Sequence, residues 1–304
     1  MLAATAIPLL PIRVAAGAPL RVQGVPTDTG LEANYAESAG IVRKSGLTID
    51  IDLLPNASAA QAAVIGGSID IGNSTVAALA IARERGLPLA IIALAAIYTT
   101  DEPTSELMVP KDSPLKTGRD LNGKTVAVNG LNTIAQFGPA AWIEATGGNP
   151  ASVHWLELPF AEMPVALARH RIDAALVAEP ALTRARQSSR VLAKAYDAVS
   201  KRFLITAWYA TQPWIDANLE TAKRFSAMIY EAGAWANANR AQTARVLAEV
   251  GHVPPELVRS MNRSTYAEKF EAALLTPQLD AARKYGTLKA AVRPESLMAP
   301  QLLQ

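Results

Sequence analysis

Polar side chains that could hold a small solute gather in short loops after predicted strands. These loops contain hydroxyls, amides and two carboxylates, and none of them carries lysine or arginine. Such groups recognise a ligand by hydrogen bonds and shape. The candidate binding residues are Thr27, Asp28, Asn73, Ser74, Thr75, Tyr98, Asn129, Asn132, Thr133, Glu179 and Trp208.

Two of these loops, residues 73–75 and 132–133, lie where a helix is expected to begin. The free backbone amides and the positive end of a helix dipole can bind an anionic group without any basic side chain. The alternative interpretation is that Ser74 and Thr133 only cap their helices. Both interpretations stay open on the sequence.

The carboxylates of Asp28 and Glu179 argue against a strongly anionic ligand. A buried carboxylate needs a partner, and a ligand amine or ring N–H could supply it. Alternatively, Asp28 caps the following helix and Glu179 belongs to a turn before Pro180. In the predicted strand 203–210, Trp208 and Tyr209 point to opposite faces, and we expect Trp208 to form an apolar wall of the site.

Several other chemistries have no support in the sequence. There is no cysteine, and the three histidines, His154, His170 and His252, lack the spacing of metal ligands. No Gly-x-Ser-x-Gly motif and no glycine-rich phosphate loop is present. We therefore expect no metal and no cofactor. With 29 basic and 27 acidic residues the net charge is only +2, so we also expect no nucleic-acid partner.

The elements that must position these loops occur twice, about 104 residues apart. Predicted strands at 20–23 and 125–128 each lead into a polar loop and a helix, then an alternating run, another helix and an Ile-Asp pair. Strands that alternate with helices predict an α/β fold with mainly parallel sheets. Two such units predict two lobes, with the ligand site in the cleft between them.

We expect a first lobe of residues 19–110 and 203–304, and a second lobe of residues 111–202 inserted into it. Two crossings would join the lobes, because the helices after Pro213 have no sheet of their own to cover. Residues 1–18 are apolar and end in small residues, as in the remnant of an export signal peptide. The run is too short and too rich in proline to span a membrane.

Several phrases of the chain resemble the periplasmic solute-binding proteins of ATP-binding-cassette importers, in the group for sulfonates, nitrate, taurine and thiamine-precursor pyrimidines. The similar phrases are residues 39–47 (AGIVRKSGL), 67–72 (GSIDIG), 120–127 (DLNGKTVA) and 166–180, which contains Ile172-Asp173 and Glu179-Pro180. Their order and spacing carry the resemblance.

The resemblance implies a two-lobed, type II periplasmic binding protein that closes around a small organic solute and delivers it to a membrane permease. It implies a monomer in the periplasm, and a sulfonate, taurine, an aromatic acid or a pyrimidine as the solute. The alternative is an enzyme of the same fold, for example in pyrimidine or menaquinone-precursor synthesis. A regulator's sensing domain is a third class, but it would need an amino-terminal helix-turn-helix.

Overall fold

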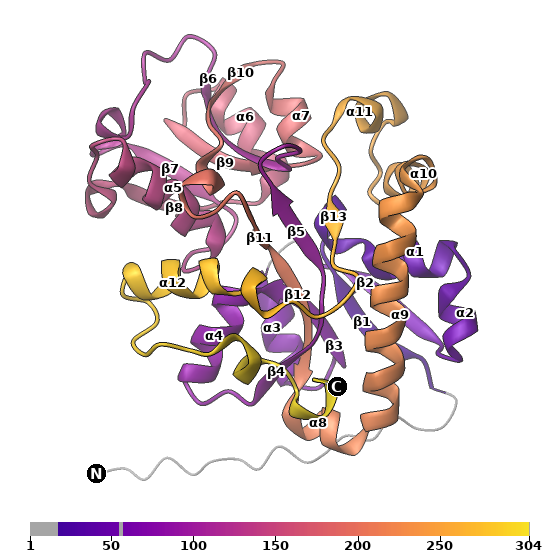
Figure 1. Ribbon diagram of the computed structural model, residues 1–304. Helices are drawn as coiled ribbons and strands as arrows, with labels where there is room; N and C mark the ends of the chain where they lie inside the picture. The colour runs from indigo at the N-terminus through magenta and orange to yellow at the C-terminus, as the bar shows by residue number, and fades with distance from the viewer. Residues whose placement is uncertain (1–17, 55–56, 304) are drawn as a thin grey trace.

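Two five-stranded sheets form the framework of the computed structural model, which describes residues 18–54 and 57–303 (Figure 1). The first sheet has the order β2-β1-β3-β12-β4, and the second has the order β10-β6-β9-β7-β8. The strands of the first are β1 (Leu20–Gly24), β2 (Ile49–Leu53), β3 (Ile71–Thr75), β4 (Leu89–Leu94) and β12 (Thr206–Thr211). Those of the second are β6 (Ser105–Pro110), β7 (Thr125–Val128), β8 (His154–Glu157), β9 (Ala174–Ala178) and β10 (Ser189–Ala193).

The predicted α/β fold is confirmed, and each sheet is mixed. β1 pairs in parallel with β2 and β3, whereas β12 is antiparallel to β3 and β4. In the second sheet β7 pairs in parallel with β8 and β9, and β6 is antiparallel to β9 and β10. The reversed strand of each sheet is the one that enters from the part of the chain that builds the other sheet.

The repeated Ile-Asp pair has the same structural role in both sheets. The Asp70 carboxylate accepts a hydrogen bond from the Arg21 backbone N–H at 2.9 Å, and the Asp173 carboxylate accepts one from the Thr125 N–H at 2.9 Å. The Asp70 N–H in turn donates to the Arg21 carbonyl, and the Asp173 N–H donates to the Thr125 carbonyl, both at 2.9 Å. The repeat therefore fixes the start of the third strand of each unit beside the first.

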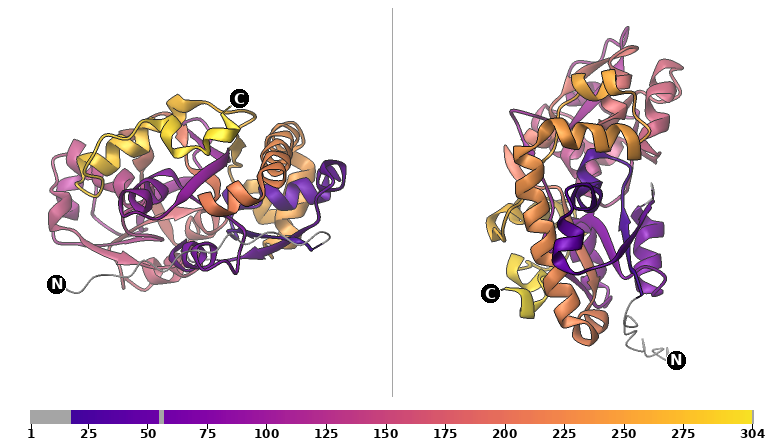
Figure 2. Two further views of the ribbon diagram at one scale, coloured as in Figure 1. Left: turned by 90° about the horizontal axis from the view of Figure 1, so that it is seen from below. Right: turned by 90° about the vertical axis from the view of Figure 1, so that its right-hand side faces the viewer.

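Helices cover both faces of the two sheets (Figures 1 and 2). On the first sheet, α1 (Glu32–Ser38), α2 (Ile41–Ser45), α8 (Gln212–Ala217) and α9 (Leu219–Ala238) contribute to one core, and α3 (Ala57–Ile65) and α4 (Val76–Glu84) pack on the other face. On the second sheet, α5 (Ile134–Ala145) packs on one face, and α6 (Met163–Ala168) and α7 (Ala181–Ala185) pack on the other. The remaining α-helices are α10 (Arg240–Val250), α11 (Pro255–Ser260) and α12 (Thr276–Lys284).

Short 3-10 helices occur in the connections. They are η1 (Asp28–Gly30), η2 (Gly118–Leu121), η3 (Pro150–Ser152), η4 (Phe160–Glu162), η5 (Ala195–Ala198), η6 (Ala272–Leu274), η7 (Pro294–Leu297) and η8 (Pro300–Leu302).

A third, small sheet lies where the chain passes between the two large ones. Its order is β11-β5-β13, with β5 (Ala96–Thr99), β11 (Arg202–Leu204) and β13 (Thr265–Tyr266). The first crossing is residues 95–104, between β4 and β6, and the second is residues 194–205, between β10 and β12. Asp197 of the second crossing contacts the first, since its carboxylate accepts hydrogen bonds from the Tyr98 hydroxyl at 2.8 Å and the Thr100 hydroxyl at 2.9 Å. The lobe boundaries at residues 110 and 203 stay a prediction.

The long helix α9 packs on the first sheet, where it contacts α1, α2 and β4.

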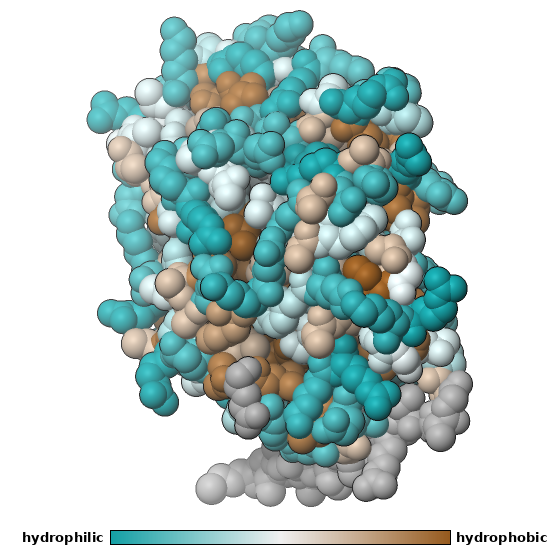
Figure 3. All heavy atoms as spheres, turned by 45° about the vertical axis from the view of Figure 1, so that its right-hand side comes forward, coloured by the Kyte–Doolittle hydropathy of each residue, from teal (hydrophilic) through white to brown (hydrophobic). Residues whose placement is uncertain are grey.

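On the face shown in Figure 3, hydrophilic residues surround small hydrophobic patches. Within residues 18–54 and 57–303, no helix has the length and apolar character needed to cross a bilayer. The predicted signal remnant, residues 1–18, lies outside the described residues except for Ala18.

Candidate functional site

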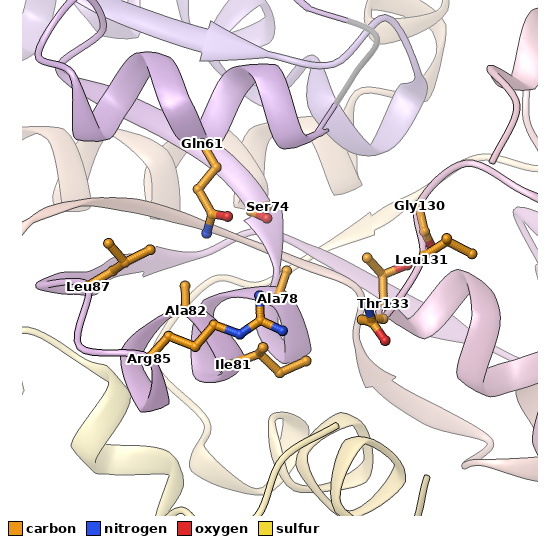
Figure 4. Close-up of a pocket in the computed structure, with 11 residues that line it drawn as sticks. Gln61, Ser74, Ala78, Ile81, Ala82, Arg85, Leu87, Gly130, Leu131 and Thr133 are labelled. Carbon is orange, nitrogen blue, oxygen red and sulfur yellow. Dashed lines mark hydrogen bonds between the residues drawn. The ribbon is translucent and has the colours of Figure 1, made fainter. Parts of the chain in front are cut away.

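A cavity of about 210 Å³ lies between helices of the first sheet and a loop of the second (Figure 4). We call it the polar cavity. One wall comes from α3 and α4, and the opposite wall is the loop between β7 and α5. Its lining residues are Gln61, Ser74, Ala78, Ile81, Ala82, Arg85, Leu87, Gly130, Leu131, Asn132 and Thr133. Three of the predicted binding residues, Ser74, Asn132 and Thr133, meet here although they come from different sheets.

The helix caps beside the polar cavity differ from the expectation at one residue. Thr75, rather than Ser74, caps α4, because its hydroxyl oxygen accepts the Ala78 N–H at 3.4 Å. In the second sheet Thr133 caps α5 by accepting the Ala135 N–H at 3.2 Å, and it donates to the Gly130 carbonyl at 2.8 Å. The Ser74 hydroxyl is therefore left for the cavity, while the Thr133 hydroxyl is already engaged in the loop.

The loop at Asn132 has a defined, unusual conformation. Asn132 has a φ of 59°, in the left-handed region that asparagine tolerates better than most residues. Its backbone N–H donates to the Gln136 side chain at 2.8 Å, and the Leu131 N–H donates to the Glu157 carboxylate at 3.3 Å. These bonds fix the wall that the second sheet contributes.

Two lining residues with polar side chains, Gln61 and Arg85, are not among the predicted binding residues. The Gln61 Nε2 is buried and has no hydrogen-bond partner among the described residues. Arg85 follows α4, and its guanidinium extends back along the helix beside the cavity (Figure 4). The signal was present, since Ala78, Ile81 or Ala82, and Arg85 recur at the spacing of one helix face. Among the residues that the structure describes, no aspartate or glutamate lines the cavity.

A second cavity of about 180 Å³ lies on another part of the boundary between the sheets. Among the predicted binding residues it contains Thr27. Its other lining residues are Val25, Pro26, Pro159, Phe160, Ala161, Pro180, Ala181, Arg184 and Gly251. This cavity is mostly apolar, and Arg184 is the one charged residue among its described lining residues.

Asn73 is buried near these loops with an unsatisfied side chain. It is 2% exposed, and both polar atoms of its amide lack a partner among the described residues. Its backbone N–H is bound by the Gln23 side chain at 3.1 Å. A buried amide without partners is unusual in a folded protein and points to a missing polar partner. Asn129 is half-buried and lines neither cavity.

Asp28 already has a full set of partners within the chain. Arg263 binds both of its oxygens, at 2.8 and 3.0 Å, and the Ser264 N–H and the Tyr35 hydroxyl donate at 2.6 and 2.5 Å. Burial alone would raise the pKa of Asp28, but the charge and hydrogen bonds of Arg263, with the other donors, lower this pKa below its ordinary value. The carboxylate thus has no need of a ligand cation.

Glu179 is buried with weaker compensation. The Thr183 hydroxyl and backbone N–H donate to it at 2.8 and 3.0 Å, and the nearest guanidinium nitrogen, from Arg186, is 4.0 Å away. Arg186 instead donates to Glu106 at 2.7 Å. Burial raises the pKa of Glu179 above its usual value despite the Thr183 hydrogen bonds.

The two aromatic candidates do not face either cavity. Trp208, expected as an apolar wall, is 0% exposed. It packs edge-on against Phe225 of α9, with 5.5 Å between the ring centroids. Its indole N–H donates to Glu32 at 2.8 Å, and burial raises the pKa of Glu32 well above its usual value. Tyr98 is also 0% exposed and binds Asp197 between the crossings. The alternation of strand faces was correct, but both faces of β12 are covered by helices.

Two like-built sheets, each with one reversed strand, define the fold class of the type II periplasmic binding proteins. The chain belongs to the NMT1/THI5-like family, whose model matches residues 33–243. No curated protein sequence matches the chain.

Solved structures agree on the fold. The periplasmic aliphatic sulphonate binding protein SsuA from Escherichia coli is 20% identical, with a TM-score of 0.73 over 93% of this chain and 98% of that one. The alkanesulfonate-binding protein SsuA from Xanthomonas axonopodis pv. citri, bound to MOPS, is 20% identical with a TM-score of 0.75 over 95% and 99%. The desulfurization enzyme DSZB is 12% identical with a TM-score of 0.67 over 94% and 98%. At these identities the likeness concerns the fold, which hosts both binding proteins and an enzyme.

Proposed function

We propose that this protein is the solute-binding component of an ATP-binding-cassette importer of the sulfonate and nitrate group. In this proposal it works in the periplasm as a monomer, captures a small organic solute between its lobes and delivers it to a membrane permease. The family and the sulphonate-binding relatives support this reading. A solute gripped by both lobes has a higher affinity for the closed form, and that difference drives closure.

The observation that carries the proposal is the composition of the polar cavity. Its walls come from both sheets, and they present the Ser74 hydroxyl, the unpartnered Gln61 Nε2 and the Arg85 guanidinium. The amino-terminal end of the twelve-residue helix α5 adds a positive dipole end. Because none of the described lining residues is a carboxylate, the chemistry of the cavity favours an organic acid, and a sulfonate or carboxylate head group would match these donors.

Arg85 provides the direct test of this proposal. We expect Arg85→Ala to weaken binding of a sulfonate by about 1.5 to 3 kcal/mol, the range for a hydrogen bond to a charged group. Isothermal titration calorimetry with MOPS, taurine and an alkanesulfonate would measure it, with nitrate and a pyrimidine as further probes.

Arg43→Ala is the matched control, because Arg43 is also exposed but lies on α2, away from both cavities. Equal affinity in wild type and Arg85→Ala would place the solute elsewhere. Binding of none of these probes would count against the importer proposal itself.

The second candidate function is an enzyme, and the observation that favours it is the shared fold of DSZB. A binding protein should return its solute unchanged, so prolonged incubation followed by mass spectrometry distinguishes the two. None of the polar cavity's lining residues in the described part of the chain is a histidine. Conversion of any bound probe would support the enzyme.

A further inference from the structure

Residues 262–264 lie between α11 and β13 and contact both the Asp28 loop and the first crossing. We call them the bridging segment. The Asp28 carboxylate accepts hydrogen bonds from the Arg263 guanidinium at 2.8 Å and from the Ser264 backbone N–H at 2.6 Å. Asn262 turns the other way, and its Nδ2 donates to the Pro103 carbonyl at 2.9 Å. Three successive residues thus connect a loop of the first sheet to the first crossing.

The crossing continues this chain of hydrogen bonds to the second sheet. Residue 104, next to Pro103, accepts the backbone N–H of Glu179 at 2.9 Å through its carbonyl oxygen. The two carboxylate-bearing loops at Asp28 and Glu179 are therefore linked through the bridging segment and the crossing. α11 and α7 are also in contact on this side of the molecule.

The surroundings make this linkage rigid at its first end. Arg263 is only 11% exposed at its side chain, and it also donates to the Tyr35 and Thr243 hydroxyls at 3.3 and 3.2 Å. Tyr266 donates its hydroxyl to the Asp28 carbonyl, and it lies on β13, which pairs with β5 of the small central sheet. At the other end the Asn262 side-chain amide donates to the Pro103 carbonyl, and the Asn262 backbone also interacts with the Glu179 carboxylate. A motion of one sheet relative to the other would strain these contacts of Asn262.

We propose that Asn262, Arg263 and Ser264 are positioning residues that tie the Asp28 loop to the first crossing and so set the separation of the two sheets. Arg263 and Ser264 hold the segment on the first sheet, and the Asn262 amide is the contact that yields when the sheets move apart. Its use in solute capture rests on the proposed function, but the coupling is a property of the ligand-free protein.

The test removes the Asn262 amide and measures the spacing of the sheets without ligand. The chain has no cysteine, so Arg43→Cys and Arg171→Cys can carry spin labels on exposed residues of the two halves. Double electron–electron resonance should show longer distances in Asn262→Ala than in wild type. Asn239→Ala is the matched control, since it also removes one asparagine amide bond, to the Trp235 carbonyl at 2.8 Å, but away from the crossing.

Hydrogen exchange of the Glu179 N–H gives a second readout that a local role would not move. We expect it to exchange about fivefold faster in Asn262→Ala, the factor for one lost hydrogen bond, and to be unchanged in Asn239→Ala. Asn262→Leu keeps the side-chain volume, and it should behave in the same way if the alanine variant folds poorly. Unchanged distances and unchanged Glu179 exchange would overturn the proposal. Neither measurement involves a solute, so this failure is distinct from failure of the importer proposal.

Discussion

Asp28 and Glu179 are both buried carboxylates, but they have different partners and their pKa values shift in opposite directions. Both carboxylates are at most 2% exposed. Asp28 is paired with the mostly buried Arg263, which lowers the pKa of Asp28. Glu179 is bound by Thr183 and lies 4.0 Å from Arg186, and burial raises its pKa despite these contacts. A buried carboxylate alone does not indicate a ligand cation, because the protein can supply the partner or shift the protonation equilibrium.

We expect the largest loss of stability when the Arg263 guanidinium that binds Asp28 is removed. Arg263→Met leaves a buried charge unpaired, and we expect it to lower the free energy of unfolding by about 3 to 5 kcal/mol. Urea denaturation would measure the loss. Arg259→Met, an exposed arginine on the neighbouring helix α11, is the control and should change stability by less than about 0.5 kcal/mol. A small loss in Arg263→Met would mean that Asp28 relies on its other donors.

A smaller effect is expected at the other loop. Arg186→Met removes the guanidinium that donates to Glu106 and faces Glu179 from 4.0 Å. Because the Arg186 side chain is 36% exposed, water screens it, and we expect a loss of about 1 to 2 kcal/mol. The same denaturation experiment applies. A loss equal to that of Arg263→Met would remove the distinction between the loops.

The pH dependence should be the smallest and most specific difference. A lowered pKa means that Asp28 stabilises the fold above the ordinary aspartate pKa, and that this contribution is lost as pH falls through the folded-state value. Glu179 has the opposite sign, because its raised pKa makes the folded state less stable as pH rises from the ordinary glutamate value toward the folded-state value.

Glu179→Gln isolates that second contribution. Its stability relative to wild type should increase between pH 4 and pH 8, by about 1.4 kcal/mol for each unit by which folding raises the Glu179 pKa. Thermal denaturation across this range would record it, and the Glu32 contribution cancels because both proteins contain Glu32. A constant difference across the range would contradict the raised pKa.

The sequence predicted the framework because the framework is built from local patterns. The repeated Ile-Asp pairs at Asp70 and Asp173 do bind corresponding strands, and the loop at Thr133 does begin a helix. The same local reasoning found Ser74 and Asn132 in the polar cavity.

The partners of these residues are the part that the sequence could not supply. Arg263 is 235 residues away from Asp28, and no local rule connects them. Arg85 reaches the polar cavity from the far end of α4, so an inspection of loops after strands misses it. Trp208 was misplaced because helix α9 covers its face of the sheet, which depends on where a later segment packs. Long-range packing decides the environments of Asp28 and Trp208, whereas the helix-face spacing that places Arg85 is a local pattern.

Asp197 has a mechanical consequence for any movement of the two halves. Its carboxylate holds Thr100 in the first crossing and, at 2.7 Å, Lys201 in the second. Because one carboxylate contacts both crossings, a displacement of either crossing would strain the contact that this carboxylate makes with the other.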